Sequence, residues 1–403
     1  MATERLYYND AYLKQFSARV ISCEPARPAS GNDAKLWQVI LDRTAFYPTS
    51  GGQPHDLGKL GTANVIGVRD EAESILHMVD APLELAEVDC TLDWPRRFDH
   101  MQQHTGQHLL SAIFQTRFNL PTVSFHLGDE ICTIDLRGLE PSEQTLSAAE
   151  RAANEIIFED RPVTVRYGTA EELSELGVRK QVDRHGVLRA IEISGVELQP
   201  CGGTHVRSTG QIGMLAVRGC SKIRQDWRVE FLCGQRAESS ARRDYQLLRQ
   251  IAEEFGCAPG EVLSAASRTL AERDANFKKF AAVLERLAAA EAALTLQSTR
   301  VNEHSLRIVS RVFENIPVEF MGFFATELTR TEKTIALLAR SECGQAFFAQ
   351  HPSASKDMSA LLKQVLEKVG GKGGGTRDFA RGKLTHSEQA AAAVDLAVKL
   401  LSG

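Results

Sequence analysis

The sequence predicts an α+β protein built from several domains, and three observations lead to this prediction. Its 403 residues exceed the length of one typical domain. Its 43% hydrophobic and 25% charged residues are the composition of an ordinary globular protein. The hydrophobic pattern also changes along the chain, and the changes divide it into residues 1–94, 95–235, 236–300 and 301–403.

The first part, residues 1–94, is rich in predicted strands. The segments KLWQVILDRTAFY, TANVIGVRD and ILHMVD are β-prone and are separated by turn residues. Such short strands predict a small β-barrel. The stretch SGGQPHD, residues 50–56, follows a strand and predicts a tight turn.

The second part, residues 95–235, mixes helices and strands. The histidine-containing stretch after Trp94–Pro95 and the segment SAAERAANEIIFED predict helices. RPVTVRY and LRAIEISG predict strands, the latter leading into a cysteine-containing loop. We therefore expect an α+β domain here.

The third part is helical and rich in Ala and Glu, with one break predicted at GCAPG. Two series of apolar residues recur every seven positions and predict a coiled-coil-like seam: Leu263, Leu270, Phe277 and Leu284, and then Phe280, Leu287 and Leu294. The seam can pack on the preceding helix as an internal hairpin or on a second subunit as a homodimer. The sequence leaves both alternatives open.

The last part alternates strands and helices. LRIVSRVF, PVEFMGFF and TIALLAR predict strands, and KDMSALLKQVLEKVG and SEQAAAAVDLAVKLL predict helices. The glycine run between these helices predicts a loop that is either mobile or approached closely by a partner. It is not a nucleotide-binding P-loop, because Lys372 is followed by Gly373 rather than by Ser or Thr.

Two distant motifs carry metal-ligand chemistry. In HMQQHTGQHLL, residues His100, His104 and His108 follow one another at four-residue steps, which place them on one face of a helix. The glutamate of the HExxH zinc-protease motif is missing. About a hundred residues later, Cys201 and His205 flank two glycines in CGGTH. Two histidines plus Cys-x-x-x-His make the four-ligand set that zinc prefers, although two unrelated motifs are the alternative.

These residues also carry a family resemblance. HTGQHLL followed by CGGTH, with FYPTSGGQPHDLG before them, resembles the editing domain of alanyl-tRNA synthetase and the free-standing AlaX-type alanyl-tRNA editing proteins over residues 1–235. GGKGGGTRDFARG resembles the glycine-rich signature of the synthetase's C-terminal tRNA-binding domain, which is related to the DHHA1 module. The resemblance implies the long form: an N-terminal β-barrel-like domain, a zinc-binding editing domain, a helical hairpin or coiled-coil linker, and a DHHA1-like α/β domain.

The resemblance implies hydrolysis of the ester that joins serine, and also glycine, to alanine tRNA. It implies Zn²⁺ bound by His104, His108, Cys201 and His205, with His100 next to these ligands or on the surface. The glycine turn accompanies family members that act on both esters. Polar or glycine positions expected to contact the aminoacyl group are Gln103, Thr122, Ser124, Gly51 and Gly52, and the catalytic residue is left unassigned. Ordinary strand and helix polarity is the alternative for Gln103, Thr122 and Ser124.

Charge limits where RNA can bind. The net charge of −5 argues against a generally basic surface, so contacts with tRNA must come from local patches. The expected tRNA-binding residues are Lys222, Arg224, Arg228, Lys372, Arg377 and Arg381. A solvated charged face is the alternative for each patch.

Other function classes fit the sequence less well. A zinc-stapled tRNA-binding protein without turnover is the main alternative. A DHH phosphoesterase is disfavoured because Asp99-His100-Met101 lacks the second histidine, and only ninety residues precede the editing region, too few for a synthetase core. Eight cysteines without paired spacing, no signal peptide and no long apolar stretch indicate a cytoplasmic protein.

Overall fold

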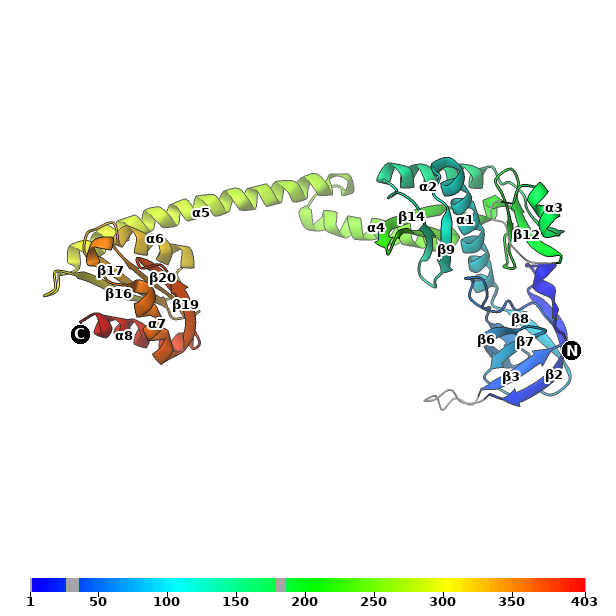
Figure 1. The fold of residues 1–403 in the computed structure, drawn as a ribbon, viewed down its shortest axis with the longest axis horizontal. Helices are drawn as coiled ribbons and strands as arrows, with labels where there is room; N and C mark the ends of the chain where they lie inside the picture. Colours follow the sequence, from blue (N-terminus) through cyan, green and yellow to red (C-terminus); the bar gives the residue numbers. More distant parts are fainter. Residues whose placement is uncertain (1, 27–35, 179–185, 403) are drawn as a thin grey trace. The chain divides into compact units, whose positions relative to one another are not determined.

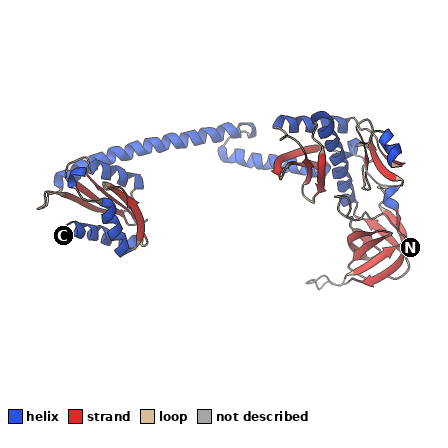
Figure 2. Ribbon diagram, in the orientation of Figure 1, coloured by secondary structure: helices blue, strands red, loops and turns tan. Residues whose placement is uncertain are grey.

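The computed structural model describes residues 2–26, 36–178 and 186–402. The chain divides into two compact units, Met1–Leu248 and Arg249–Gly403, each described here by itself (Figure 1). Figure 2 shows that both units combine helices and strands. None of the described helices is both long and apolar enough to span a membrane.

The chain begins with a barrel. Its strands are hydrogen-bonded in the closed order β2-β3-β7-β6-β5-β8, and alternate side chains such as Val39, Ile75 and Val79 fill the interior. The strands are β2 (Gln15–Pro25), β3 (Trp37–Leu41), β5 (Gly58–Leu60), β6 (Ala63–Glu71), β7 (Ser74–Val79) and β8 (Glu87–Leu92). A short parallel pair, β1 (Glu4–Arg5) and β4 (Arg43–Thr44), lies outside this ring.

The helix that carries the histidines, α1 (Trp94–Phe118), is the central element of the first unit. Asp93 caps it by accepting a hydrogen bond from the Arg96 backbone N–H, and Pro95 stands in its first turn. Asn119 ends it in the left-handed conformation at φ 54°. The helix is buried on almost every side between His100 and Phe114, so its polar side chains must find partners inside the protein.

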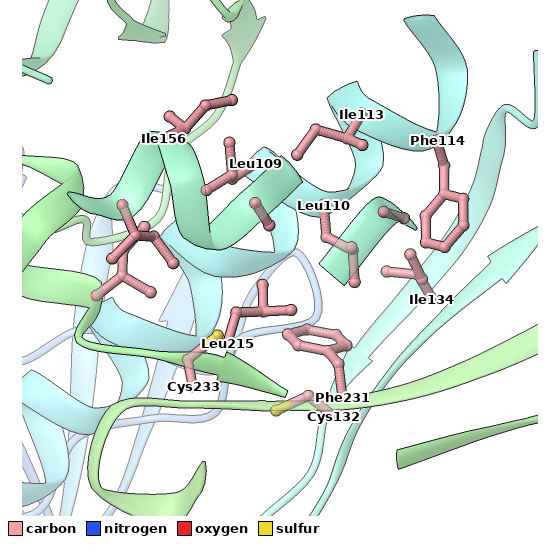
Figure 3. Close-up of a cluster of buried hydrophobic side chains, with 14 of the residues drawn as sticks. Leu109, Leu110, Ile113, Phe114, Cys132, Ile134, Ile156, Leu215, Phe231 and Cys233 are labelled. Carbon is pink, nitrogen blue, oxygen red and sulfur yellow. The ribbon is translucent and has the colours of Figure 1, made fainter. Parts of the chain in front are cut away.

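Two sheets surround α1. The first has the order β14-β15-β10-β9, and α1 packs against it together with α2 (Glu143–Phe158) through the apolar side chains drawn in Figure 3. Its strands are β9 (Thr122–Leu127), β10 (Cys132–Leu136), β14 (Leu215–Ile223) and β15 (Asp226–Cys233). The second sheet consists of β11 (Val163–Gly168), β12 (Leu188–Ile193) and β13 (Glu197–Pro200), with α3 (Ala170–Glu175) beside it. Strand β13 ends directly before Cys201.

The helical segment is broken where the sequence predicts it. Helix α4 (Gly234–Phe255) and helix α5 (Val262–Ser298) flank the GCAPG stretch. Within the second unit, Leu284 of the predicted seam is buried against α6 (Val318–Leu328). The remaining seam residues are at least half exposed: Leu263, Leu270, Phe277, Phe280, Leu287 and Leu294.

The second unit is a five-stranded sheet with helices on both faces. The strand order is β16-β17-β18-β20-β19, with β16 and β17 parallel. Alternate residues of β17 divide the core: Ile335 and Leu337 pack toward α7 and α8, and Ala336 and Leu338 toward α5 and α6. The elements are β16 (Arg307–Phe313), β17 (Thr334–Arg340), β18 (Gln345–Gln350), β19 (Gly371–Gly375), β20 (Phe379–Leu384), α7 (Met358–Val369) and α8 (Ala390–Ser402).

Two predictions for this unit are wrong. PVEFMGFF is part of helix α6 rather than a strand, and its buried residues Phe320, Phe324 and Leu328 recur at helical spacing. A nearly continuous apolar run does not distinguish a buried strand from a buried helix. The glycine run is strand β19 rather than a loop, because its backbone pairs with β20 from Gly371 to Gly375.

Candidate metal centre and its cavity

The four predicted metal ligands converge in the first unit. His104 and His108 come from α1, and Cys201 and His205 come from the loop after β13. Their ligand atoms all lie within 4.8 Å of one another. Cys201 Sγ lies 3.5 Å from His104 Nε2 and 3.3 Å from His205 Nε2. The helix and the loop thus bring one sulfur and three imidazoles to one point.

The outer nitrogen of His104 has a defined partner. His104 Nδ1 lies 2.8 Å from Gln53 Oε1. That oxygen also accepts a hydrogen bond from the Thr204 backbone N–H, and Gln53 Nε2 donates to Thr204 Oγ1, so the orientation of the amide is fixed. His104 Nδ1 must therefore carry the proton, which leaves Nε2 free as a ligand.

The other two histidines follow the same arrangement. His108 Nδ1 lies 3.0 Å from the buried Glu197 carboxylate, which only accepts when ionised. His205 Nδ1 lies 3.1 Å from Thr105 Oγ1, whose own hydrogen is donated to the Met101 carbonyl. With Nδ1 held on the outside, all three rings turn Nε2 inward, which is the orientation of metal-bound histidines.

The fourth donor is a stabilised thiolate. Burial by itself raises the pKa of the Cys201 thiol, but the adjacent His104 and His205 imidazoles outweigh burial and bring the pKa well below its usual value. The Gly203 N–H also donates to Cys201 Sγ at 3.3 Å. Arg189 holds the loop by donating to the carbonyls of Cys201 and Gly203. One thiolate sulfur with three imidazole nitrogens fits the tetrahedral preference of zinc.

His100 does not join this cluster. Its side chain is 1% exposed, so the expected surface position is wrong, and neither ring nitrogen has a hydrogen-bond partner among the described residues. Burial first, and then the positive charge of Arg96, lower the pKa of His100 to about 3. His100 is therefore neutral, and it contacts none of the four ligands through a hydrogen bond.

A cavity of about 800 Å³ adjoins the centre. His104, His108 and Cys201 form part of its wall, so a molecule in the cavity would lie beside the four donors. The wall also includes Ser50, Gly51, Gln107, Thr122, Ser124, Phe125 and Gln199. An occupant of this cavity would therefore meet both hydrogen-bonding groups and an aromatic ring.

The predicted substrate-contacting residues divide into two groups. Gly51, Thr122 and Ser124 line the cavity, and the two hydroxyls donate to Ser111 Oγ and Asp135 Oδ2 at 2.8 Å each. Gly52 does not line it; its backbone has φ 83°, and a Cβ there would stand 2.7 Å from the Phe125 ring.

The fifth predicted contact, Gln103, does not line the cavity. Its amide donates to the Cys233 carbonyl at 2.9 Å and accepts from the Cys233 N–H at 2.8 Å. It is fully buried against β15 and is not in the cavity wall. Both ends of the amide are hydrogen-bonded to Cys233, which ties Gln103 to the sheet.

The glycine turn is tied to α1 by a buried ion pair. Asp56 and Arg97 have fully buried side chains, and Arg97 Nε lies 3.0 Å from both carboxylate oxygens. Asp56 also accepts from the Tyr47 N–H, while Arg97 donates to the carbonyls of Ala11 and Ala45. These bonds fix the turn, and with it Gln53, against the helix that carries the histidines.

The predicted tRNA-binding residues are placed in both units. Lys222 and Arg224 are exposed at the β14–β15 hairpin, whereas Arg228 is paired with Asp135 at 2.7 Å. In the second unit, Lys372 and Arg381 are exposed on the paired strands β19 and β20. Arg377 is exposed and donates to the Lys356 carbonyl.

Comparison with known proteins gives the family. Over 399 residues the chain is 32% identical to the alanyl-tRNA editing protein AlaX-L of Pyrococcus horikoshii, covering 94% of each chain. The chain belongs to the alanyl-tRNA editing proteins. A second member, Aarsd1 of Rattus norvegicus, is 29% identical over 397 residues, again with 94% of each chain covered. The alanine–tRNA ligase of Pyrococcus abyssi is 29% identical over 99% of this chain, which corresponds to 44% of the ligase.

Two domain-family models agree with this placement. Residues 188–229 match the second additional domain of threonyl and alanyl tRNA synthetases, and residues 306–403 match the DHHA1 domain. The C-Ala domain of Aquifex aeolicus alanyl-tRNA synthetase is 25% identical, covering 26% of this chain and 96% of that domain, with a TM-score of 0.23. In this editing protein, the first match contains the Cys201–His205 loop.

Three residues of the site were not assigned from the sequence. Gln53 and Thr105 lie inside the quoted motifs SGGQPHD and HTGQH, so their positions were a usable signal. Glu197 lies four residues before Cys201 in an ordinary strand, and nothing in its neighbourhood marks it as a histidine partner. Its role depends on β13 passing beside α1.

Proposed function

We propose that this editing protein hydrolyses, in trans, the ester that joins serine, and also glycine, to the 3′ end of alanine tRNA. The observation that carries the proposal is the cavity of about 800 Å³ whose wall contains three of the four converging Cys and His donors. The cavity provides room for an aminoacyl group beside a site suited to a cation. Membership in the editing family supplies the substrate class.

Such a reaction is needed because a binding pocket discriminates poorly between amino acids of similar size and shape. A synthetase pocket built for alanine cannot strongly exclude glycine, which lacks a methyl group, or serine, which adds only a hydroxyl. A second site must therefore examine the finished ester. A separate cavity with its own polar wall can apply a different test from that of the synthetase.

The residues that would hold Zn²⁺ are His104, His108, Cys201 and His205. When bound, the ion would supply Lewis-acid polarisation and a fixed anchor beside the cavity. We infer that anchoring is its main contribution, because four protein donors already fill a tetrahedral set. The chain's own polar groups at Thr122, Ser124 and Ser50 then orient the aminoacyl group and place the ester for attack by water.

Contacts with the tRNA body are proposed for exposed cations. Lys222 and Arg224 in the first unit, and Lys372, Arg377 and Arg381 in the second, are exposed and would meet phosphates, Arg377 while hydrogen-bonded to the Lys356 carbonyl. Arg228 would have to give up part of its pairing with Asp135 to do so. A homodimer through the exposed apolar residues of α5 is also proposed, and light scattering that gives the mass of one chain would exclude it.

The central test is deacylation of Ser-, Gly- and Ala-tRNA(Ala) by the purified protein, before and after zinc removal. We expect hydrolysis of the seryl and glycyl esters, much slower hydrolysis of the alanyl ester, and loss of activity on chelation with recovery on added Zn²⁺. Cys201→Ala should abolish zinc binding and activity. Cys220→Ala on β14, outside the cluster, is the matched control.

Two results would contradict the proposal. Full deacylation by zinc-free Cys201→Ala would exclude an essential metal. Binding of tRNA without turnover of any ester by the wild-type protein would favour a zinc-stapled RNA-binding protein instead.

A further inference from the structure

Gln107 is a buried amide in the cavity wall to which the proposed reaction assigns no role. It lies on α1 between His104 and His108, and all three residues line the cavity. Its side chain is 3% exposed. Of its two polar ends, Nε2 donates to Ser111 Oγ at 2.9 Å. Its Oε1 has no hydrogen-bond partner among the residues that the structure describes.

The orientation of this amide follows from its neighbours. Ser111 Oγ accepts hydrogen bonds from both Gln107 Nε2 and Thr122 Oγ1. Two donors therefore occupy the serine oxygen, and the Gln107 carbonyl is left facing away from it. The result is one unsatisfied acceptor on a residue of the cavity wall that stands between two of the metal ligands.

An unsatisfied buried acceptor is unusual in a folded protein. More than nine in ten buried backbone polar groups, and most buried side-chain polar atoms, have a partner, because leaving one unpaired costs more than the bond is worth. A bound molecule that brings a donor to Oε1 removes this penalty. A molecule that covers Oε1 with a methyl group leaves the oxygen unpaired and retains this free-energy cost.

We propose that Gln107 Oε1 accepts the hydroxyl of the seryl group and determines selectivity against the alanyl ester. The inference rests on the proposed deacylase function and names its specificity residue. Serine brings the missing donor. Alanine places a methyl group in the same space and provides none, and a site built around a hydroxyl rejects the analogue that lacks it.

The same geometry explains why glycine can remain a substrate. Without a side chain, the glycyl group leaves open the space that the hydroxymethyl group of serine would fill. A water molecule, whose share of liquid volume is about 30 Å³, can occupy that space and donate to Oε1. Alanine is the one ester of the three that fills the space without satisfying the oxygen.

The test uses Gln107→Met, which keeps the length of the side chain and removes the acceptor. On the full-length zinc-loaded protein, kcat/KM for Ser-tRNA(Ala) should fall about 10- to 100-fold. The value for Gly-tRNA(Ala) should change by less than about threefold, because water supplies its contact. The ratio of seryl to alanyl activity should therefore fall sharply, which a merely structural role would not produce.

The matched control is Gln115→Met, the same substitution about two turns further along α1 and outside the cavity wall. Zinc content must equal that of the wild type in both variants, since Gln107 adjoins a ligand. Equal losses on seryl and glycyl esters, or an unchanged ratio of seryl to alanyl activity, would overturn the inference. A wild-type protein inactive on Ser-tRNA(Ala) would instead refute the proposed function itself.

Discussion

Replacing Gly203 with alanine should disrupt the candidate metal centre through a steric effect on one ligand. A Cβ at this position would overlap the His104 ring, standing 2.5 Å from His104 Nδ1 and 2.9 Å from Gln53 Oε1. Ordinary contacts between such atoms are about 3.5 to 4.0 Å, so these groups would have to separate by about 1 Å.

The His104 ring has little freedom to make this movement. Its Nδ1 is held 2.8 Å from Gln53, and its Nε2 lies 3.5 Å from Cys201 Sγ on the other side. Displacing the ring therefore weakens either the bond that sets its tautomer or the position of the ligand atom. Loss of such support typically lowers metal affinity about 10- to 100-fold, which corresponds to about 1.4 to 2.7 kcal/mol.

The neighbouring glycine provides a matched control in the same loop. A Cβ at Gly202 would meet its nearest atom, Tyr8 Oη, at 3.7 Å, which is ordinary contact. Zinc affinity is measured by competition with a chromophoric chelator. The affinity of Gly202→Ala should be within about threefold of the wild-type value, and that of Gly203→Ala should fall by the larger factor given above. Comparing the free energies of unfolding of the zinc-free variants with that of the zinc-free wild type would reveal a general folding defect. Equal zinc affinities for the two variants would refute the steric reasoning.

Two further predictions concern the barrel and its junction with α1. Asp56→Asn removes the charge that pairs with the buried Arg97 and should lower the free energy of unfolding by about 3 to 5 kcal/mol in urea titrations. The control Asp129→Asn, at an exposed ion pair, should lower it by less than about 1 kcal/mol. Similar losses for the two variants would contradict the argument from burial. Burial lowers the pKa of His77 to about 4, whereas its pKa in the unfolded chain is about 6.5. Between these two pH values the unfolded chain binds more protons than the folded protein, so the stability falls as the pH is lowered from about 6.5 to about 4. The contribution of His77 to this fall should reach about 3 kcal/mol. The buried His100 contributes to the same fall, so His77→Gln should make the fall smaller by the His77 share rather than abolish it. The exposed His126→Gln should leave the profile as in the wild type, and an unchanged profile for His77→Gln would contradict the reasoning.

Several features could be predicted because they depend on local spacing. Histidines four residues apart must share a helix face, and Cys201 and His205 are close enough in the chain to meet a common ion. The strands of the barrel and the break between α4 and α5 follow from alternation and from turn residues. In each case, the deciding interactions join residues near one another in the sequence.

Other features depend on contacts that the local pattern does not contain. Helix α6 is apolar at most positions, so its period was obscured and only its packing against α5 and the sheet shows a helix. The glycines of β19 have poor intrinsic strand preference, yet Gly373 lies opposite Gly382 of β20, where a Cβ would strike the neighbouring backbone. Sheet pairing therefore decided the conformation.

The sequence by itself determined the four donor residues and the helix and loop that carry them, because ligand type and spacing are local properties. Only the tertiary structure decided which polar neighbours serve the site. Gln103 and Gln107 are alike in the sequence, but packing of α1 against β15 gives the first amide its partners, whereas the second lines the cavity and its oxygen has no partner among the described residues. Gln53 and Glu197 likewise gain their roles from a turn and a strand that the fold brings beside α1, since a hydrogen bond requires proximity in space rather than in sequence.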